Sequence, residues 1–346
     1  MDKVILEIIT TQDKWNGLLK EIGDFDFYHT FDYHVIEKSK SQTPILLKYT
    51  ENNIVIGLPL LIRKIRNTKY YDATSVYGYA GPISKGVDVS FDNVLFTKTI
   101  VDYFITNNIV SVFSRINPFI NYQKNILINC GEIVNQGKIV YIDLSLEEVN
   151  QIKKYQKRLR TYINKARKQC FISKAESKDD IKEFMAIYYE NMERVNATKH
   201  YFFGEDYFKG IMESNDFETE IYLAKDPSSG NTMAGCMFVT MNKIVHYHLS
   251  GCKKEYLDVA PVKLLIDNMR LVSSKKELLY FNLGGGLGAN HEDSLFRFKS
   301  SFSKDFRDFN LWKLIVNEDI YNHLVEINKV TVETTYFPKY RLAENN

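Results

Sequence analysis

A glycine-rich stretch followed by a lysine is the part of this sequence best suited to chemistry. Residues 281–290 (FNLGGGLGAN) hold four glycines directly after a short apolar run. Glycines let the backbone turn sharply and let a ligand approach closely, because no Cβ is in the way. Leu295, Phe298 and Phe302 then recur at helical spacing, which predicts a helix with one face packed inward and Lys299 beside it. A strand, a glycine turn and a helical lysine indicate the corner of an active site. On composition alone, a solvated lysine after a plain glycine loop is favoured.

Two histidines form the second candidate group. His246 and His248 alternate on a predicted strand over residues 244–249, so both imidazoles are expected on one side. They could begin a metal site, but no third ligand stands at a recognisable spacing, so no metal is expected. Histidines that contact a substrate, or that simply pack, are favoured, and His248 is a candidate proton acceptor.

Several known signatures are missing from the sequence. There is no GxSxG elbow for a serine nucleophile. The glycine run has neither the following Lys-Ser or Lys-Thr of a nucleotide P-loop nor the GxGxxG spacing of a dinucleotide site. Helix-turn-helix, zinc-finger and RNA-recognition signatures are also missing.

Positive charge is concentrated in residues 149–175, which contain nine Lys and Arg and no acid. Tyr155, Leu159, Tyr162, Ile163 and Ala166 form an apolar stripe there at the spacing of one helix face. Like charges on adjacent turns destabilise a helix. This density therefore indicates either a surface that attracts phosphate or a solvated linking helix, and the two alternatives stay open.

Arg194 ends a second predicted amphipathic helix, whose inward side runs from Ile181 to Val195. An arginine at a helix C-terminus is usually a favourable partner of the helix dipole. The aromatic residues 201–203 (YFF) that follow allow Arg194 another role, in which its guanidinium binds a phosphate or carboxylate through two parallel hydrogen bonds.

The remaining elements repeat in order. Strands at 45–49 and 54–62 form a predicted hairpin, followed by a bend, a helix at 93–105 and a strand at 109–115. A hairpin at 220–225 and 233–241 begins the same series again and ends in the strand at 278–283. Gly57 and Gly235 occupy the same place in the two hairpins. The series predicts two copies of one α/β unit.

Composition limits the class of protein. A chain of 346 residues with 45% hydrophobic and 25% charged residues is typical of two globular domains. The net charge of +2 does not indicate a nucleic-acid binder, so no DNA partner is expected. Four scattered cysteines fit a reducing compartment, and no long uncharged stretch predicts a transmembrane segment. We expect a cytoplasmic protein, with peripheral contact at the inner membrane face left open.

Several motifs together resemble the double-GNAT acyltransferases of the Fem-like group, which attach amino acids or acyl groups to cell-envelope precursors. The matching pieces, spread over almost the whole chain, are residues 77–82 (YGYAGP), 141–145 (YIDLS), 163–168 (INKARK), 188–194 (YYENMER), 247–251 (YHLSG), 282–286 (NLGGG) and 298–299 (FK).

The resemblance implies an α/β (α+β) fold of two GNAT-type domains, each a mixed, mostly antiparallel sheet flanked by helices, which face a shared cleft. We place them at residues 1–146 and 147–346. The resemblance further implies that Lys299 lies near the transferred carbonyl, with His248 as the second catalytic candidate. The expected substrate contacts are Arg194, Tyr247, Phe298, Asn282, Gly284, Gly285, Tyr79, Arg160 and Lys165.

The implied activity is transfer of an aminoacyl or acyl group to an amine of a cell-envelope precursor. This acceptor would be a peptidoglycan precursor, an amino-sugar nucleotide or a glycan, carried either as a sugar nucleotide or on a lipid. No tightly bound cofactor is expected. Ordinary GNAT enzymes carry a Gln/Arg-x-x-Gly-x-Gly/Ala turn for coenzyme A, whereas residues 252–258 here read CKKEYLD. Aminoacyl-tRNA and an acyl thioester, on coenzyme A or an acyl carrier protein, therefore both remain candidate donors. A non-catalytic RNA-binding module is the alternative of another class.

Overall fold

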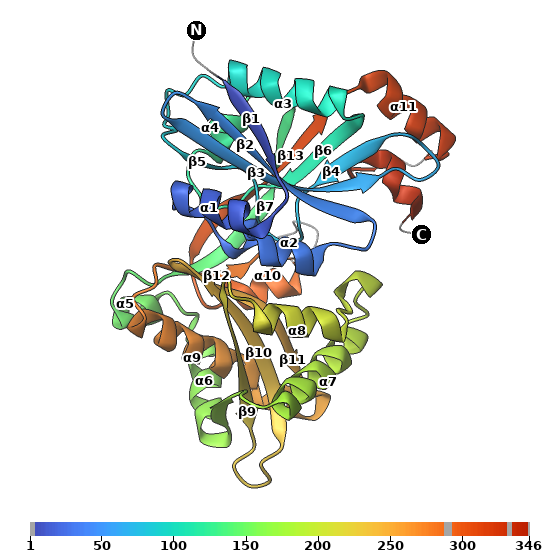
Figure 1. Cartoon of the computed structure of the whole chain (residues 1–346). Coiled ribbons are helices and arrows are strands. Elements are labelled where there is room, and N and C mark those ends of the chain that lie inside the picture. Colours follow the sequence, from blue (N-terminus) through green and yellow to red (C-terminus); the bar gives the residue numbers. More distant parts are fainter. Residues whose placement is uncertain (1–3, 287–292, 331–333, 345–346) are drawn as a thin grey trace. The chain divides into compact units, whose positions relative to one another are not determined.

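The computed structural model describes residues 4–286, 293–330 and 334–344. The chain forms two compact units, the first made of residues 1–136 with 309–346 and the second of residues 137–308 (Figure 1). Each unit has apolar cores of its own. Phe96, Phe104 and Trp312 are buried in the first, and Phe238 and Phe281 in the second.

The first unit is a sheet in the order β1-β2-β3-β4-β6-β13, with β5 beside β3. All of these pairs are antiparallel except β4 with β6. Its strands are β1 (Ile5–Ile9), β2 (Gln42–Glu51), β3 (Ile54–Lys64), β4 (Tyr71–Thr74), β5 (Ile83–Lys85), β6 (Ile109–Arg115) and the C-terminal part of β13 (Asp305–Ile315). Its helices are α1 (Gln12–Ile22), η1 (Phe27–His29), α2 (Phe31–Glu37), α3 (Val94–Thr106), α4 (Gln123–Leu127), α11 (Glu318–Ile327) and η4 (Lys339–Glu344).

The second unit has the sheet order β7-β12-β11-β10-β9-β8, in which only β11 and β12 are parallel. Its strands are β7 (Glu132–Asp143), β8 (Phe171–Lys174), β9 (Glu218–Lys225), β10 (Thr232–Met241), β11 (Ile244–Cys252) and β12 (Tyr280–Gly284). Its helices are α5 (Glu148–Lys153), α6 (Lys157–Gln169), α7 (Lys178–Arg194), η2 (Lys199–Tyr201), α8 (Glu205–Glu213), η3 (Lys254–Val259), α9 (Pro261–Lys275) and α10 (Ser294–Lys299).

The predicted repeat of one α/β unit is confirmed, and the structure adds strands β4, β5 and β8, which were not among the predicted strands. In each unit an antiparallel series of four strands leads into a helix, α3 or α9, and then into a strand parallel to the last of the four. The two glycines mark equivalent positions. A Cβ on Gly57 would lie 3.3 Å from Ile22 of α1, and one on Gly235 would lie 2.5 Å from the ring of Phe184 in α7. Both glycines therefore let a helix pack closely on the second strand of a hairpin.

The last strand of each sheet is exchanged between the two halves of the sequence. β7 follows the first series of elements in the chain but pairs with β12 of the second unit. β13 follows β12 but pairs with β6 of the first unit, through Leu311–Ile315. The units therefore differ from the predicted domains at 1–146 and 147–346, because β13 returns residues 309–346 to the first unit.

Two local predictions need correction. The basic segment is not one helix but α5 and α6, because Gln156 donates its backbone N–H to the carbonyl of Ser301 (2.9 Å) and the chain bends there. After the glycines, helix α10 ends at Lys299, so Phe302 lies beyond it and Phe296 is the buried residue of the helix. No helix in the described ranges is long and apolar enough to cross a membrane.

Candidate functional site

The helix that carries Lys299 is short and is fixed at its start by a capping carboxylate. Asp293 accepts the backbone N–H of Phe296 at 2.9 Å. At the other end, the half-buried ammonium of Lys299 donates to the carbonyl of Gly285 at 2.6 Å. Burial lowers the pKa of Lys299 from 10.5 to about 8, and the Asp293 carboxylate opposes this shift. At neutral pH the ammonium is therefore mostly charged but much closer to losing its proton than an exposed lysine.

Two of the glycines are needed for this arrangement. Gly284 has φ of +78°, a backbone conformation that disfavours any residue with a Cβ. A Cβ on Gly286 would lie 2.4 Å from an Asp293 carboxylate oxygen and 2.8 Å from Cβ of Phe296. The glycines thus allow α10 to approach the end of β12. Residues 287–290 of the predicted glycine run lie outside the described residues.

Asn282 connects the glycine turn to strand β11. Its side-chain oxygen accepts the backbone N–H of Gly284 at 2.8 Å, and its amide lies 3.2 Å from Nδ1 of His246. Both side chains are 2% exposed. The parallel pairing of β11 with β12 covers only three residue pairs and ends at His246 and Asn282. The Lys299, Gly285 and Asn282 group therefore forms where the two strands stop pairing.

His248 lies at an irregularity of β11. Phe238 opposes Tyr247 and Met237 opposes Leu249, so His248 is an extra residue in the strand and breaks the alternation assumed for the two histidines. Its Nε2 lies 2.6 Å from the hydroxyl of Tyr207 on α8. Burial, with a smaller effect from His246, lowers the pKa of His248 to about 3. The ring is therefore neutral at physiological pH and is a weak base.

Two aromatic candidates line the core beside this group. Tyr247 packs at the edge of the apolar core and exchanges a hydrogen bond with the Ser250 hydroxyl. Burial raises the pKa of Tyr247 well above its ordinary value, so its hydroxyl keeps its proton. Phe298 lies edge-on to Phe302, with the ring centres 5.6 Å apart.

The other expected contacts lie elsewhere in the chain. Arg194 is exposed at the end of α7 and donates to the side chain of Asn191. Tyr79 belongs to the first unit, where its ring lies edge-on to Tyr28 and to Phe309.

Arg160 and Lys165 lie on the exposed side of α6. Their hydrogen bonds go to the carbonyls of Lys153 (3.3 Å) and Asp258 (3.4 Å), and not to the residues around Lys299.

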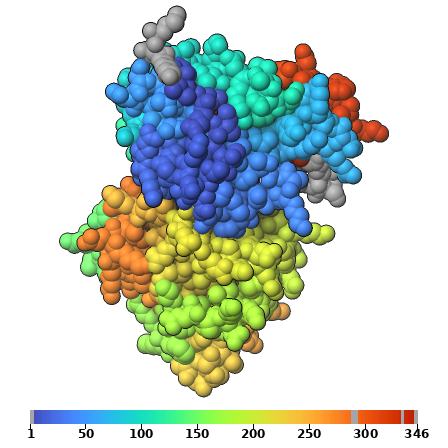
Figure 2. Space-filling model, in the orientation of Figure 1, coloured from blue at the N-terminus to red at the C-terminus, as the bar shows by residue number. Residues whose placement is uncertain are grey.

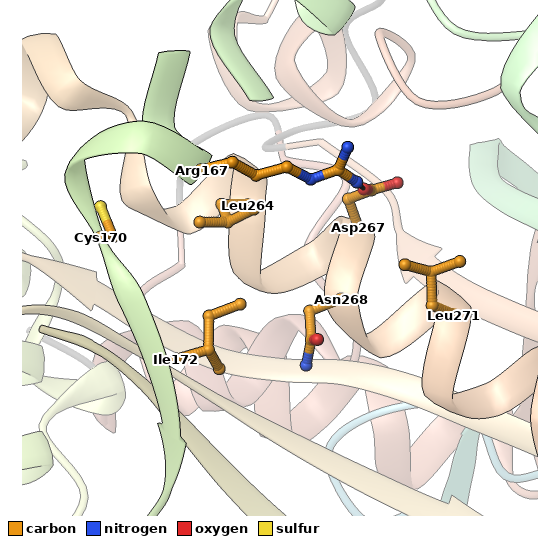
Figure 3. A pocket seen from close by; sticks show the side chains of 7 residues that line it. All are labelled: Arg167, Cys170, Ile172, Leu264, Asp267, Asn268 and Leu271. Atoms are coloured by element: carbon orange, nitrogen blue, oxygen red, sulfur yellow. Dashed lines mark hydrogen bonds and ion pairs between the residues drawn. The ribbon is translucent and has the colours of Figure 1, made fainter. Parts of the chain in front are cut away.

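A pocket of about 250 Å³ opens between α6, β8 and α9 (Figure 3). None of the site residues expected from the sequence lines it; its lining residues are Arg167, Cys170, Ile172, Leu264, Asp267, Asn268 and Leu271.

Asp267, a buried residue that lines this pocket, accepts from Arg167 (2.5 Å), Arg270 (3.1 Å) and Tyr155 (2.9 Å). Sequence reasoning missed this network because Tyr155 lies 112 residues from Asp267 along the chain. It missed Tyr207 for the same reason. The ranges that the structure describes hold no group of three or more His, Cys, Asp or Glu able to bind a metal ion.

Comparison with known proteins identifies the fold. No protein-family model matches the sequence, and no curated protein matches it significantly. Among solved structures, the chain is similar to FemX, with 12% identity, a TM-score of 0.71, and coverage of 92% of this chain and 99% of that one. L-PGS from Bacillus licheniformis gives 13% identity, a TM-score of 0.57, and coverage of 94% and 98%.

A tandem GNAT protein from the clavulanic acid biosynthesis pathway gives 7% identity, a TM-score of 0.53, and coverage of 91% and 99%. At these identities the likeness concerns architecture, and it extends over nearly the full length of each protein. The chain therefore has the α/β fold of two tandem GNAT-type units, and it resembles FemX and the tandem GNAT protein in overall architecture.

Proposed function

We propose that the protein is an N-acyltransferase that forms an amide by moving an aminoacyl or acyl group onto an amine of a cell-envelope precursor. The observation that carries this proposal is the Lys299 ammonium, held on the Gly285 carbonyl at the end of the parallel β11–β12 pairing. The double-GNAT fold and the Fem-like motifs support the same class of reaction.

In this reaction the neutral amine of the acceptor attacks the carbonyl carbon of an ester or thioester. The new C–N bond forms, the C–O or C–S bond to the carrier breaks, and the proton lost by the amine is balanced by the one taken up by the leaving oxygen or sulfur. The carbonyl oxygen becomes negative on the way. A charge aimed at such an oxygen lowers the barrier by about 3–4 kcal/mol. Lys299 supplies that charge, and the backbone N–H of Gly285 assists it, since the N–H of Gly284 is donated to Asn282.

The remaining residues bind and orient. With a pKa of about 3, His248 acts as a hydrogen-bond acceptor toward Tyr207 more readily than as a carrier of the amine proton. Tyr247, Phe298 and Asn282 shape the surroundings of Lys299.

Arg194, Arg160 and Lys165 contact phosphates of a sugar-nucleotide or lipid-linked acceptor or of the donor, and Tyr79 is a candidate substrate contact within the first unit. No tightly bound cofactor takes part.

One feature of α9 favours aminoacyl-tRNA over coenzyme A as the donor. The helix starts with Pro261 directly after Ala260, which has φ of +58°. Proline has no N–H, so the start of this helix offers a pyrophosphate fewer backbone donors than an ordinary helix N-terminus. An acyl thioester, on coenzyme A or an acyl carrier protein, is the second candidate donor.

Replacement of Lys299 by methionine tests the role of the ammonium. We expect kcat for amide formation to fall roughly 100- to 1,000-fold, because the oxyanion loses its charged partner. Lys304→Met is the matched control, since Lys304 is exposed and donates to the carbonyl of Ser300. Near-normal turnover of Lys299→Met would remove Lys299 from the mechanism.

Ribonuclease treatment of the donor mixture separates the candidate donors. Loss of transfer supports aminoacyl-tRNA, and transfer that persists with a thioester supports the second candidate. An RNA-binding module without chemistry would bind RNA in a salt-sensitive way and be indifferent to Lys299→Met.

A further inference from the structure

The exposed side of α6 concentrates positive charge that the described structure does not neutralise. Its cations, called here the α6 surface, are Lys157, Arg158, Arg160, Lys165 and Lys168, and all are exposed. In the part of the chain that the structure describes, none of the five forms an ion pair with a carboxylate. The opposite side of the helix, with Leu159, Ile163 and Ala166, is buried in the core of the second unit. The charges are therefore displayed on a rigidly anchored helix about 20 Å long.

This charge is local to one region of the chain. Residues 149–175 hold nine Lys and Arg and no acid, whereas the whole chain has a net charge of +2, so the remainder carries −7. An anionic surface would therefore attract this region and repel much of the rest. In Figure 2 the green segment that includes α5 and α6 reaches the molecular surface.

Apolar side chains flank the α6 surface. Lys165 donates to the carbonyl of Asp258, which places the adjacent Leu257, 42% exposed, beside the helix. Phe171, 46% exposed, follows shortly after the C-terminal end of α6. Basic side chains with exposed apolar neighbours suit the headgroup region of an anionic bilayer, where the charges meet lipid phosphates and the apolar groups enter the interface.

The aromatic residue on the helix is unavailable for base stacking. The Tyr162 ring is covered by the ammonium of Lys263 at 3.8 Å and by the guanidinium of Arg158 at 5.4 Å, and Arg158 also donates to its hydroxyl. Proteins that bind single-stranded RNA combine positive charge with aromatic rings free to stack on bases. Tyr162 is the one aromatic residue of α6 and is not free in this way, and the exposed ring of Phe171 lies beyond the helix; this favours a lipid surface over RNA.

We propose that the α6 surface docks the protein onto a bilayer rich in anionic phospholipid. The contact is electrostatic, with Leu257 and Phe171 reaching the interface at its edges. It extends the proposed function, because it brings the enzyme to a membrane surface, and it does not require that Lys299 be catalytic.

Vesicle sedimentation of the full chain tests the proposal. We expect binding to phosphatidylcholine vesicles that contain phosphatidylglycerol, weakening as salt rises, and no binding to phosphatidylcholine alone. Lys157→Glu with Lys168→Glu should weaken the binding at least about tenfold, since each surface cation contributes to the attraction. Lys40→Glu with Lys124→Glu, the same charge change at exposed lysines of the first unit, should leave it unchanged within about twofold.

Circular dichroism checks that both variants are folded, and Lys157→Gln with Lys168→Gln replaces the first variant if it is not. Three outcomes overturn the proposal: equal binding to neutral and anionic vesicles, equal loss in both double variants, or binding to a polyuridylate probe without binding to anionic vesicles. The vesicle assay contains no substrate and does not depend on transferase activity. A failure of membrane binding can therefore be distinguished from a failure of the proposed transferase function.

Discussion

At the residue scale, the pKa of Lys299 follows from the surroundings of its side chain at the end of helix α10. Lys299 is the last residue of helix α10, and its ammonium donates to the carbonyl of Gly285. The surroundings remove solvent from the charge, which lowers its pKa to about 8. A charge held in this way is costly for the folded state and useful only if something negative arrives, such as a developing oxyanion.

This cost predicts a stability gain in Lys299→Met. Below pH 8 both folded and unfolded forms hold the lysine proton, and the folded form bears the full desolvation cost. We expect the variant to be more stable by roughly 1 to 3 kcal/mol at pH 7, measured by urea denaturation. From pH 8 to 10.5 the folded form releases the proton first, so the stability of the native lysine protein rises and the difference shrinks.

Lys304→Met serves as the control, because Lys304 is exposed and its ammonium lies in solvent. A variant at position 299 that is less stable than the native protein at pH 7 would contradict this account.

At the scale of elements, each unit has a glycine at the equivalent position of its sheet, and in each unit a helix packs closely on that glycine. Gly57 lies on β3 under α1, and Gly235 lies on β10 under α7. The second contact is much tighter: its nearest neighbour is the fully buried ring of Phe184, which cannot turn away. A close helix-to-sheet contact of this kind leaves no room for a single methyl group.

Gly235→Ala should therefore destabilise the protein by about 1–3 kcal/mol, as overpacking of a core does. Gly57→Ala, with its neighbours at 3.2–3.4 Å, should cost clearly less. Gly17→Ala in helix α1 is the opposite control, because a Cβ added at Gly17 would have no neighbouring atom within 4 Å. We expect this substitution to stabilise the protein by roughly 0.5–1 kcal/mol, since alanine favours a helix more than glycine does. Urea denaturation followed by circular dichroism ranks the three, and equal effects at positions 57 and 235 would refute the packing argument.

At the scale of the whole molecule, the exchanged strands make the first unit depend on the C-terminal end of the chain. β13 supplies Trp312, which is fully buried and donates to the carbonyl of Cys130. Arg341 ion-pairs at 2.5 Å with the buried carboxylate of Asp72, which also binds Arg63. The second unit, residues 137–308, is continuous in sequence.

Removal of residues 309–346 should therefore unfold the first unit. Trp15, the other tryptophan of the chain, is buried in that unit and donates to the carbonyl of His29. We expect its fluorescence to shift to the red in the truncated protein, because the ring becomes solvated. The full-length Trp312→Phe variant isolates the Trp15 signal as a control, and an unshifted emission in the truncated protein would contradict the dependence.

The sequence by itself determined the local elements and their repetition. The strands around Gly57 and Gly235 and the helices that follow were readable because hydrophobic periodicity and turn residues act over a few neighbouring positions. The same local signals drew attention to Lys299, Asn282 and the glycines between them.

Only the tertiary structure decided which distant residues meet. The exchange of β7 and β13 leaves no mark in local periodicity, because strand pairing is chosen by the whole sheet. The same holds for the contact of Tyr207 with His248 and for the burial that lowers the pKa of Lys299. Both depend on packing between elements far apart in the chain, which residue spacing along the sequence does not reveal.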